Sequence, residues 1–301
     1  MYPNQPIQGN TPMKTNHEAP GSANHAEIAP PAAWDEIAAG YARFVAPGEQ
    51  LFSSEALRLV GLTRGEAFLD VAAGPGGLAL AAARLGASVL ATDWAPAMVS
   101  QFQARIRAEK LHNAEARVMD AHALTVADDS YDVTGSQFGV MLVPDQPLAL
   151  REMVRVTKPG GRVLIVAYGS PTEFEALQFF ISALRTVVPA FEGLPEPPPL
   201  EFQVSDPGVL RDRLTTAGLG AVEVDTSFRE RVEFDSGSAC WKWMCHSNPV
   251  VGMILSEVSE GEQAVVRDVL DGMIRERAAD GPFAVLTAPL NIGWGHKPVP
   301  R

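Results

Sequence analysis

The chain has 301 residues, 46% of them hydrophobic and 20% charged, a composition typical of a globular protein with a sizeable core. Lys and Arg number 24 against 36 Asp and Glu, which gives a formal net charge of −12. Because a negative surface repels polyanions, nucleic acid is disfavoured as a partner. The sequence shows neither a run of 18 apolar residues nor a secretory signal, so we expect no membrane span and a cytoplasmic location.

The two cysteines, Cys240 and Cys245, lie five residues apart and His246 follows them. A structural zinc site needs four ligands at closer spacing, so no metal site is expected. Residues five apart on a helix point in different directions, which also argues against a disulfide. We therefore predict ordinary buried thiols.

Residues 1–33 are rich in Pro, Asn, Ala and Gly without an apolar period, which predicts a disordered N-terminal tail. From Trp34 to Phe44 apolar residues recur at helical spacing, so the folded domain, residues 34–301, is expected to open with an amphipathic helix. This helix is predicted to end near Pro47 and Gly48. It either packs on the core or lies over a ligand.

Apolar runs typical of buried strands then alternate with helical stretches. The expected strands cover residues 67–71, 88–92, 116–119, 131–137 and 162–168, and the expected helices cover 78–85, 95–111 and a stretch ending near Thr157. Pro96 suits the first turn of a helix and Gly86 a helix end. The alternation predicts parallel strands joined by helical crossovers.

The second half of the chain is less regular. It predicts helices at about 172–188, 207–217 and through most of 237–280, and strands at 222–228 and 283–290. Residues 171–250 carry nine of the 22 aromatic side chains, which indicates a helical cap formed by insertions at about 171–202 and 237–280. Alternatively, these aromatics only attach the inserted helices to the core.

The segment at residues 68–77, FLDVAAGPGG, is a strand that runs into a glycine-rich turn and a helix. Glycines let the backbone approach a ligand closely, and a helix N-terminus offers free N–H groups to an anionic group. Residues 74–79 also fit the dinucleotide fingerprint with Ala in the last place, so a nicotinamide or flavin enzyme is an alternative.

Three acids at successive strand ends favour a different cofactor. Asp70 lies at the end of the first strand, immediately before the glycine-rich turn. A carboxylate there would repel a pyrophosphate and attract the ammonium of an amino-acid cofactor. Asp93 ends the second strand, where a ribose-binding acid is expected, and Asp120 ends the third, where it can accept from an adenine amino group. Each acid alone could merely cap a loop or helix, but together they indicate one site.

Five segments occur in the order found in class I S-adenosylmethionine-dependent methyltransferases: FLDVAAGPGG, VLATDWAPAM, VMDAHAL, YDVTGSQFGVMLVPD and LREMVRVTKPGGRVLIVAYG. Over residues 34–295 the chain resembles the ubiquinone/menaquinone-biosynthesis-like small-molecule group, methyltransferase type 11. The resemblance implies a Rossmann-like α/β fold, with a seven-stranded, mostly parallel sheet in the order 3-2-1-4-5-7-6 and the last strand antiparallel. It also implies S-adenosyl-L-methionine as cofactor, with S-adenosyl-L-homocysteine as product.

The resemblance also implies the residues that hold each part of the cofactor. They are Asp70, Ala72, Gly74 and Gly76 for the methionine part, Asp93 and Trp94 for the ribose, and Asp120 and Ala121 for the adenine, with Tyr41, Met98 and Gln137 completing the site. Ala72 departs from the family, which usually has glycine there, and its methyl group crowds the cofactor.

The acceptor is expected to be a small metabolite. Enzymes of this fold that methylate exocyclic nitrogens of nucleobases, or glutamine, carry an Asn/Asp-Pro-Pro-aromatic motif after the fourth strand, whereas this chain has SQFG at residues 136–139. Arsenic methylation relies on several thiols, so two cysteines disfavour it. O-, C- or N-methylation of a small molecule stays open.

The candidate pocket residues are large and mostly aromatic, which predicts an aromatic or lipophilic acceptor. They are Phe138, Met141, Tyr168, Phe180 and Trp241. Methyl transfer does not require a general base, and where one is needed His246 is the candidate. Two other function classes stay open: a protein that binds S-adenosylmethionine without methyl transfer, and an NAD(P)-dependent oxidoreductase.

Overall fold

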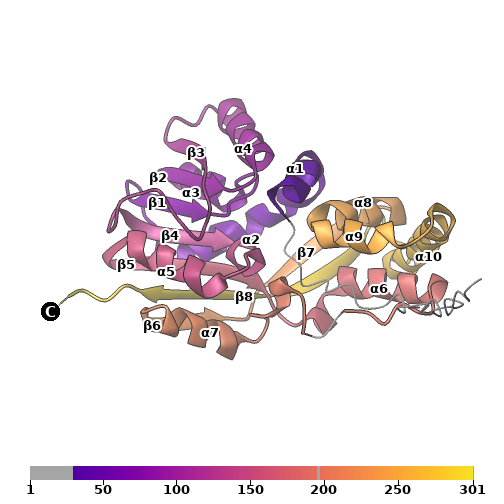
Figure 1. Cartoon of the computed structure of the whole chain (residues 1–301). Helices are drawn as coiled ribbons and strands as arrows, with labels where there is room; N and C mark the ends of the chain where they lie inside the picture. Colours follow the sequence, from indigo (N-terminus) through magenta and orange to yellow (C-terminus); the bar gives the residue numbers. More distant parts are fainter. Residues whose placement is uncertain (1–29, 195–196, 301) are drawn as a thin grey trace, which may run out of the picture.

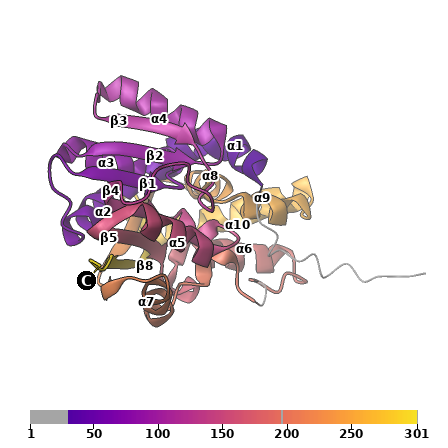
Figure 2. The ribbon, with the colours of Figure 1, turned by 60° about the vertical axis from the view of Figure 1, so that its left-hand side comes forward.

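The computed structural model describes residues 30–194 and 197–300, and its centre is a mixed β-sheet (Figures 1 and 2). The strands on its main path are β1 (Ala67–Val71), β2 (Ser88–Asp93), β3 (Ala114–Val118), β4 (Tyr131–Gln137), β5 (Thr157–Tyr168), β6 (Gly220–Asp225) and β8 (Ala284–His296). Their order is β3-β2-β1-β4-β5-β8-β6. Strands β1 to β5 are parallel, and β8 is antiparallel to both its neighbours. The expected fold class and order are confirmed, with β8 taking the position of the expected strand 7, between β5 and β6.

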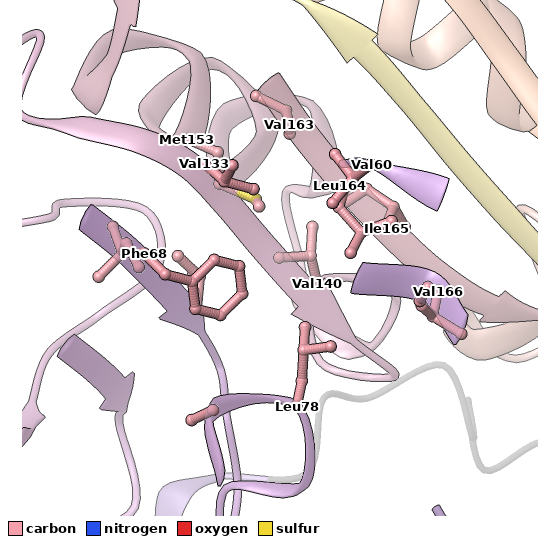
Figure 3. Close-up of a cluster of buried hydrophobic side chains, with 14 of the residues drawn as sticks. Val60, Phe68, Leu78, Val133, Val140, Met153, Val163, Leu164, Ile165 and Val166 are labelled. Carbon is pink, nitrogen blue, oxygen red and sulfur yellow. The ribbon is translucent and has the colours of Figure 1, made fainter. Parts of the chain in front are cut away.

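The sheet core forms because the central strands are apolar on both faces, as parallel strands covered by helices require. Phe68, Val133 and Leu164 are fully buried, and Figure 3 shows them among neighbouring aliphatic side chains. The covering helices include α3 (Gly77–Leu85), α4 (Pro96–Glu109), α5 (Gln146–Val156) and α7 (Pro207–Thr216). Gly86 ends α3 in a left-handed conformation and Pro96 opens α4, both as predicted.

The N-terminal helix is longer than predicted. It comprises α1 (Pro31–Gly40), a π-helical turn (Tyr41–Val45) and α2 (Ala46–Leu59). The predicted end near Pro47 is wrong, because proline is tolerated in the first turn of a helix, where its missing N–H has no intrahelical acceptor. A disordered tail was predicted for residues 1–33, of which residues 1–29 lie outside the described part of the chain. Residues 31–33 belong to α1, so this end of the predicted tail is helical.

One strand was not predicted. β7 (Arg229–Phe234) pairs antiparallel with the first half of β8, whose second half pairs with β5 and β6. β8 extends beyond the predicted residue 290 through two glycines, where Leu210 and Leu214 lie 3.0 Å from the position of a Cβ on Gly293. Small residues therefore let α7 pack directly on the strand.

A second hydrophobic core lies beside the sheet. It joins β7 and the start of β8 to α6 (Glu175–Val187), α8 (Gly237–Ser247), α9 (Pro249–Ser256) and α10 (Glu260–Ala278). Figure 1 shows these helices gathered around the end of β8 that projects past β5, and α1 contacts α8 and α9 from the sheet side. No helix in the described part of the chain is long and apolar enough to cross a membrane.

Gly135 in β4 offers a test of how tightly the sheet core is packed. A Cβ there would lie 2.8 Å from Phe68 Cζ and 3.0 Å from Leu78 Cδ2, so Gly135→Ala should lower the free energy of unfolding by about 1–3 kcal/mol. Gly272→Ala is the control, since nothing lies within 4 Å and alanine favours the helix by up to about 1 kcal/mol. Urea denaturation measures both, and a Gly135→Ala variant as stable as the parent would contradict the packing.

Candidate functional site

The turn between β1 and α3 passes through three residues with positive φ. Ala72, Gly74 and Gly76 have φ angles of 52°, 54° and 82°. Only glycine adopts this region without a steric cost, so Ala72 is strained where a glycine would not be. A Cβ on Gly76 would lie 2.1 Å from the Phe102 ring, so α4 requires a glycine at this position.

A cavity with about 780 Å³ of empty space lies at the carboxyl ends of β1, β2 and β4, and we call it the strand-end cavity. Its lining residues are Trp34, Tyr41, Glu49, Asp70, Ala72, Ala73, Gly74, Pro75, Gly77, Leu78, Asp93, Trp94, Met98, Met119, Asp120, Ala121, Gln137, Phe138, Gly139, Leu142 and Val143. Every expected cofactor contact except Gly76 is in this lining. Gly76 instead faces Phe102, and Gly77 takes its place on the wall.

The structure brings the three predicted acids to this one cavity. Asp93 accepts hydrogen bonds from the N–H groups of Gly74 (2.8 Å) and Ala95 (2.9 Å), and burial raises its pKa to about 6. Asp120 is half exposed, and its Oδ1 accepts from the His122 N–H at 2.9 Å. These acids therefore cap local backbone and line the cavity at the same time.

Asp70 carries an unused hydrogen-bond acceptor. Its Oδ2 accepts from the Ala79 N–H at 2.9 Å, while its buried Oδ1 has no partner among the described residues. Burial raises the pKa of this carboxyl well above its usual value. An unpaired buried oxygen on a cavity wall is the arrangement expected where a ligand supplies the missing donor.

Glu49 is a fourth acid of the site, and sequence reasoning missed it. This buried side chain from α2 accepts the Tyr41 hydroxyl hydrogen bond at 2.5 Å, and burial raises its pKa to about 6. Its Oε2 lies 2.8 Å from the position of a Cβ on Gly77, so the carboxylate faces the start of α3. No pattern in the sequence marks this residue, because its place in the site depends on long-range contacts of α2 such as the hydrogen bond from Ser53 to Gln137.

The charges on the wall are of one sign. Four carboxylates line the strand-end cavity, and the lining contains no Lys, Arg or His among the residues that the structure describes. A pyrophosphate would be repelled by these carboxylates, whereas a cationic ligand would be stabilised in this desolvated site. The geometry therefore argues against the dinucleotide alternative.

A second cavity, with about 860 Å³ of empty space, adjoins the first, and we call it the aromatic cavity. Its lining residues are Tyr41, Val45, Phe138, Met141, Leu142, Tyr168, Phe174, Leu177, Phe180, Ile181, Phe191, Leu194, Pro199, Glu201, Phe202, Trp243, Met244, Ser247, Asn248, Val250, Val251 and Ile254. Tyr41, Phe138 and Leu142 line both cavities, so the two share a wall. Four of the five residues predicted for the acceptor pocket are in this lining: Phe138, Met141, Tyr168 and Phe180.

Phe138 forms part of the shared wall in a strained conformation. Its φ is 56°, which is a rare value for a bulky side chain. Its ring stacks on Tyr168 with centroids 4.3 Å apart and meets Phe52 edge-on at 5.4 Å. Aromatic packing on both sides holds the strained residue at the junction of the cavities.

Two further predicted site residues, besides Gly76, lie outside both linings. Trp241 packs near Phe180 under the guanidinium of Arg267, and Trp243, about half a turn further along α8, faces the aromatic cavity instead. The His246 ring packs on Phe44 at 5.3 Å, and its Nδ1 lies 2.7 Å from the Lys242 carbonyl oxygen. His246 is therefore not in position to reach a molecule in either cavity.

A buried carboxyl stands behind the aromatic cavity. Glu230 of β7 is 1% exposed, and its Oε2 accepts from the Tyr168 hydroxyl at 3.1 Å. Its Oε1 has no partner among the described residues. Burial, reinforced by the charge of Glu49, raises the pKa of Glu230 to about 8. Sequence reasoning missed this residue together with the strand that carries it.

The thiols take no part in either cavity. Cys240 is buried, Cys245 is half-buried, and both are free. Burial raises their pKa values to about 12 and about 11, so both are protonated at neutral pH and act as packing groups, as predicted.

Comparisons with known proteins agree with this geometry. A family model described as a methyltransferase domain matches residues 69–165. An uncharacterised protein of Mycobacterium tuberculosis is 31% identical over 219 residues, which cover 73% of this chain and 76% of that protein. A demethylmenaquinone methyltransferase of Halalkalibacterium halodurans is 35% identical over 145 residues, 46% of this chain and 57% of that enzyme.

The solved structures show the same architecture. The YcgJ protein of Bacillus subtilis matches with a TM-score of 0.53 and 16% identity, over 83% of this chain and 99% of that chain, which is a likeness of fold. The family model covers the glycine turn and the strand-end acids, and the mycobacterial relative extends the match over most of the chain. This chain therefore belongs to the class I S-adenosylmethionine-dependent methyltransferases, in the group related to the menaquinone-biosynthesis enzymes.

Proposed function

We propose that this chain transfers a methyl group from S-adenosylmethionine in the strand-end cavity to a small aromatic or lipophilic molecule in the aromatic cavity. The observation that carries the proposal is the wall that an acid-lined cavity and an aromatic cavity share at Tyr41, Phe138 and Leu142. A cationic donor and an apolar acceptor are thereby brought side by side.

The strand-end cavity suits the cofactor residue by residue. The unpartnered Asp70 Oδ1 would accept from the ammonium of the methionine part, beside Ala72 and Gly74. Asp93 and Trp94 would hold the ribose. Asp120 and Ala121 would hold the adenine. Tyr41, Met98 and Gln137 would contact the remaining parts of the cofactor.

The cofactor, when bound, supplies a methyl group on a sulfonium, whose positive charge is dispersed during transfer. The contribution of the protein is then to exclude water and to align the acceptor, which can account for much of the rate. The rings of Phe138, Tyr168 and Trp243 line the aromatic cavity and present apolar surface to its interior. In this proposal the cap over the acceptor is formed by α6, α8, α9 and α10, which lie within the expected insertions at about 171–202 and 237–280.

Where the acceptor must lose a proton, we assign the transfer to the Tyr168–Glu230 pair instead of His246. The acceptor proton would pass to the Tyr168 hydroxyl oxygen, while the tyrosine proton passes along the 3.1 Å hydrogen bond to Glu230 Oε2. A carboxyl with a pKa of about 8 is half ionised near pH 8 and about one-tenth ionised at pH 7, and this ionised form is the one that can accept the proton.

Methyl transfer from labelled S-adenosylmethionine tests the function. Incubation with a metabolite extract should move the label into an organic-extractable small molecule and leave macromolecules unlabelled. Asp93→Ala is the inactive comparison. If the protein binds S-adenosylhomocysteine yet transfers no label to any extract, the cofactor is used without methyl transfer and the proposal fails.

Asp93→Ala should weaken S-adenosylhomocysteine binding at least about 100-fold, since it removes charge-assisted hydrogen bonds to two ribose hydroxyls of about 1.5–3 kcal/mol each. It should also lower the melting temperature, because the N–H groups of Gly74 and Ala95 lose their acceptor. Asp206→Ala is the matched control: that side chain also accepts two backbone N–H groups, but at the start of α7. Calorimetry showing unchanged affinity in folded Asp93→Ala would refute the ribose assignment.

Glu230→Gln should change how stability depends on pH. Between pH 4.5 and about 8 the folded carboxyl keeps its proton while the unfolded one loses it, so the folded state becomes less stable as pH rises through this window. The amide cannot ionise, so the melting temperature of Glu230→Gln relative to the parent should rise by a few degrees from pH 5 to pH 9. Glu233→Gln, at an exposed position of the same strand, is the control. A pH-independent difference would show that Glu230 is not perturbed.

A further inference from the structure

The polar groups on the wall of the aromatic cavity present hydrogen-bond acceptors to its interior. The Tyr41 hydroxyl donates its proton to Glu49, the Tyr168 hydroxyl to Glu230 and the Ser247 hydroxyl to the Met244 carbonyl. Each hydroxyl oxygen is left with lone pairs and no proton for a ligand. The lining also contains no Lys, Arg or His in the part of the chain that the structure describes.

Glu201 adds a carboxylate to this wall. It lies in the short 3-10 helix Leu200–Phe202, and its Oε1 accepts from the Asn248 side-chain amide at 3.1 Å. The Asn248 carbonyl oxygen accepts from the Val250 N–H at 3.0 Å, which fixes the orientation of the amide toward Glu201. The backbone N–H of Glu201 itself also bonds this carboxylate, and no cationic side chain is among the described groups that act on it.

Such a wall discriminates between ligands by charge. A carboxylate or phosphate group would find no donor side chain of opposite charge and would be repelled by Glu201, and from behind the wall by ionised Glu49. A hydroxyl or an amine would satisfy the unused acceptors, and a protonated amine would also compensate the charge of Glu201. Burial raises the pKa of Glu201, which is the response of a carboxylate without a cationic partner.

We propose that the acceptor cavity selects a lipophilic molecule that carries a hydrogen-bond donor, preferably a protonated amine, and that Glu201 is the residue that recognises this group. The proposal rests on the assignment of the aromatic cavity as the acceptor site. It excludes acceptors that bind through a carboxylate or a phosphate.

Three probes that share one ring system test this selection: 2-(aminomethyl)naphthalene, 2-naphthalenemethanol and 2-naphthoate. Each is titrated calorimetrically into the full chain at neutral pH, with and without saturating S-adenosylhomocysteine. We expect the amine to bind more tightly than the alcohol, and the carboxylate to bind at least about tenfold more weakly than the amine.

Glu201→Gln should weaken binding of the amine about tenfold, change binding of the alcohol much less, and so reduce the ratio between amine and carboxylate affinities. Glu192→Gln removes the same charge from an exposed position in the neighbouring loop and should leave all three affinities unchanged. S-adenosylhomocysteine affinity should be equal in both variants and the parent, which shows that they are folded.

Three outcomes would overturn the proposal: naphthoate binding as tightly as the amine, a Glu201→Gln variant with an unchanged affinity ratio, or no binding by any probe. The titration with S-adenosylhomocysteine alone separates this failure from that of the proposed function. Loss of cofactor binding contradicts the methyltransferase assignment, whereas cofactor binding without probe selection contradicts only the role of Glu201.

Discussion

Carboxylates that are buried without an ion-pair partner among the described residues are the constraint on which this site depends. Glu49, Asp70, Asp93 and Glu230 are all buried, and burial raises the pKa of each of them. An ionised carboxylate taken out of water is costly unless hydrogen bonds or a cation compensate for the lost hydration. Backbone N–H groups and tyrosine hydroxyls compensate in part. In our proposal the ammonium and sulfonium of the cofactor supply the rest.

The same acids tie the fold together. Asp93 connects the end of β2 to the glycine turn, Asp70 connects β1 to α3, and the Tyr168–Glu230 hydrogen bond connects β5 to β7. Tyr41 lies in a π-helical turn, a distortion that is frequent at functional sites, and its bond to Glu49 joins this turn to α2. In our proposal the same side chains therefore hold both the fold and the ligand, so a ligand that satisfies the acids would also stabilise the elements they join.

Much of the fold could be predicted because its signals are local or shared with relatives. Apolar runs and helix ends marked by Gly86 and Pro96 gave the alternation of strands and helices, and the resemblance gave the order of strands. Acids placed directly after strands meet at one edge of a parallel sheet, so Asp70, Asp93 and Asp120 could be brought together from the sequence alone.

The features that the sequence did not predict depend on tertiary contacts. β7 escaped prediction because its inward face begins with Glu230, so the strand reads as polar. Glu49 followed a Pro-Gly pair that suggested a helix end, although it lies in the first turn of α2. To predict that Trp243, and not Trp241, faces the aromatic cavity, the rotation of α8 about its axis would have to be known. Gly76 must be a glycine because a Cβ there would clash with Phe102, a residue distant in sequence.

The account is tested most directly by a crystal structure of the complex with S-adenosylhomocysteine. We expect the ribose hydroxyls on Asp93, the adenine beside Asp120 and Ala121, and the ammonium within hydrogen-bond distance of the Asp70 carboxylate or linked to it by one water. The sulfur should face the wall of Tyr41 and Phe138 that the two cavities share. Density for the ligand outside the strand-end cavity, or a sulfur turned away from the aromatic cavity, would contradict the account.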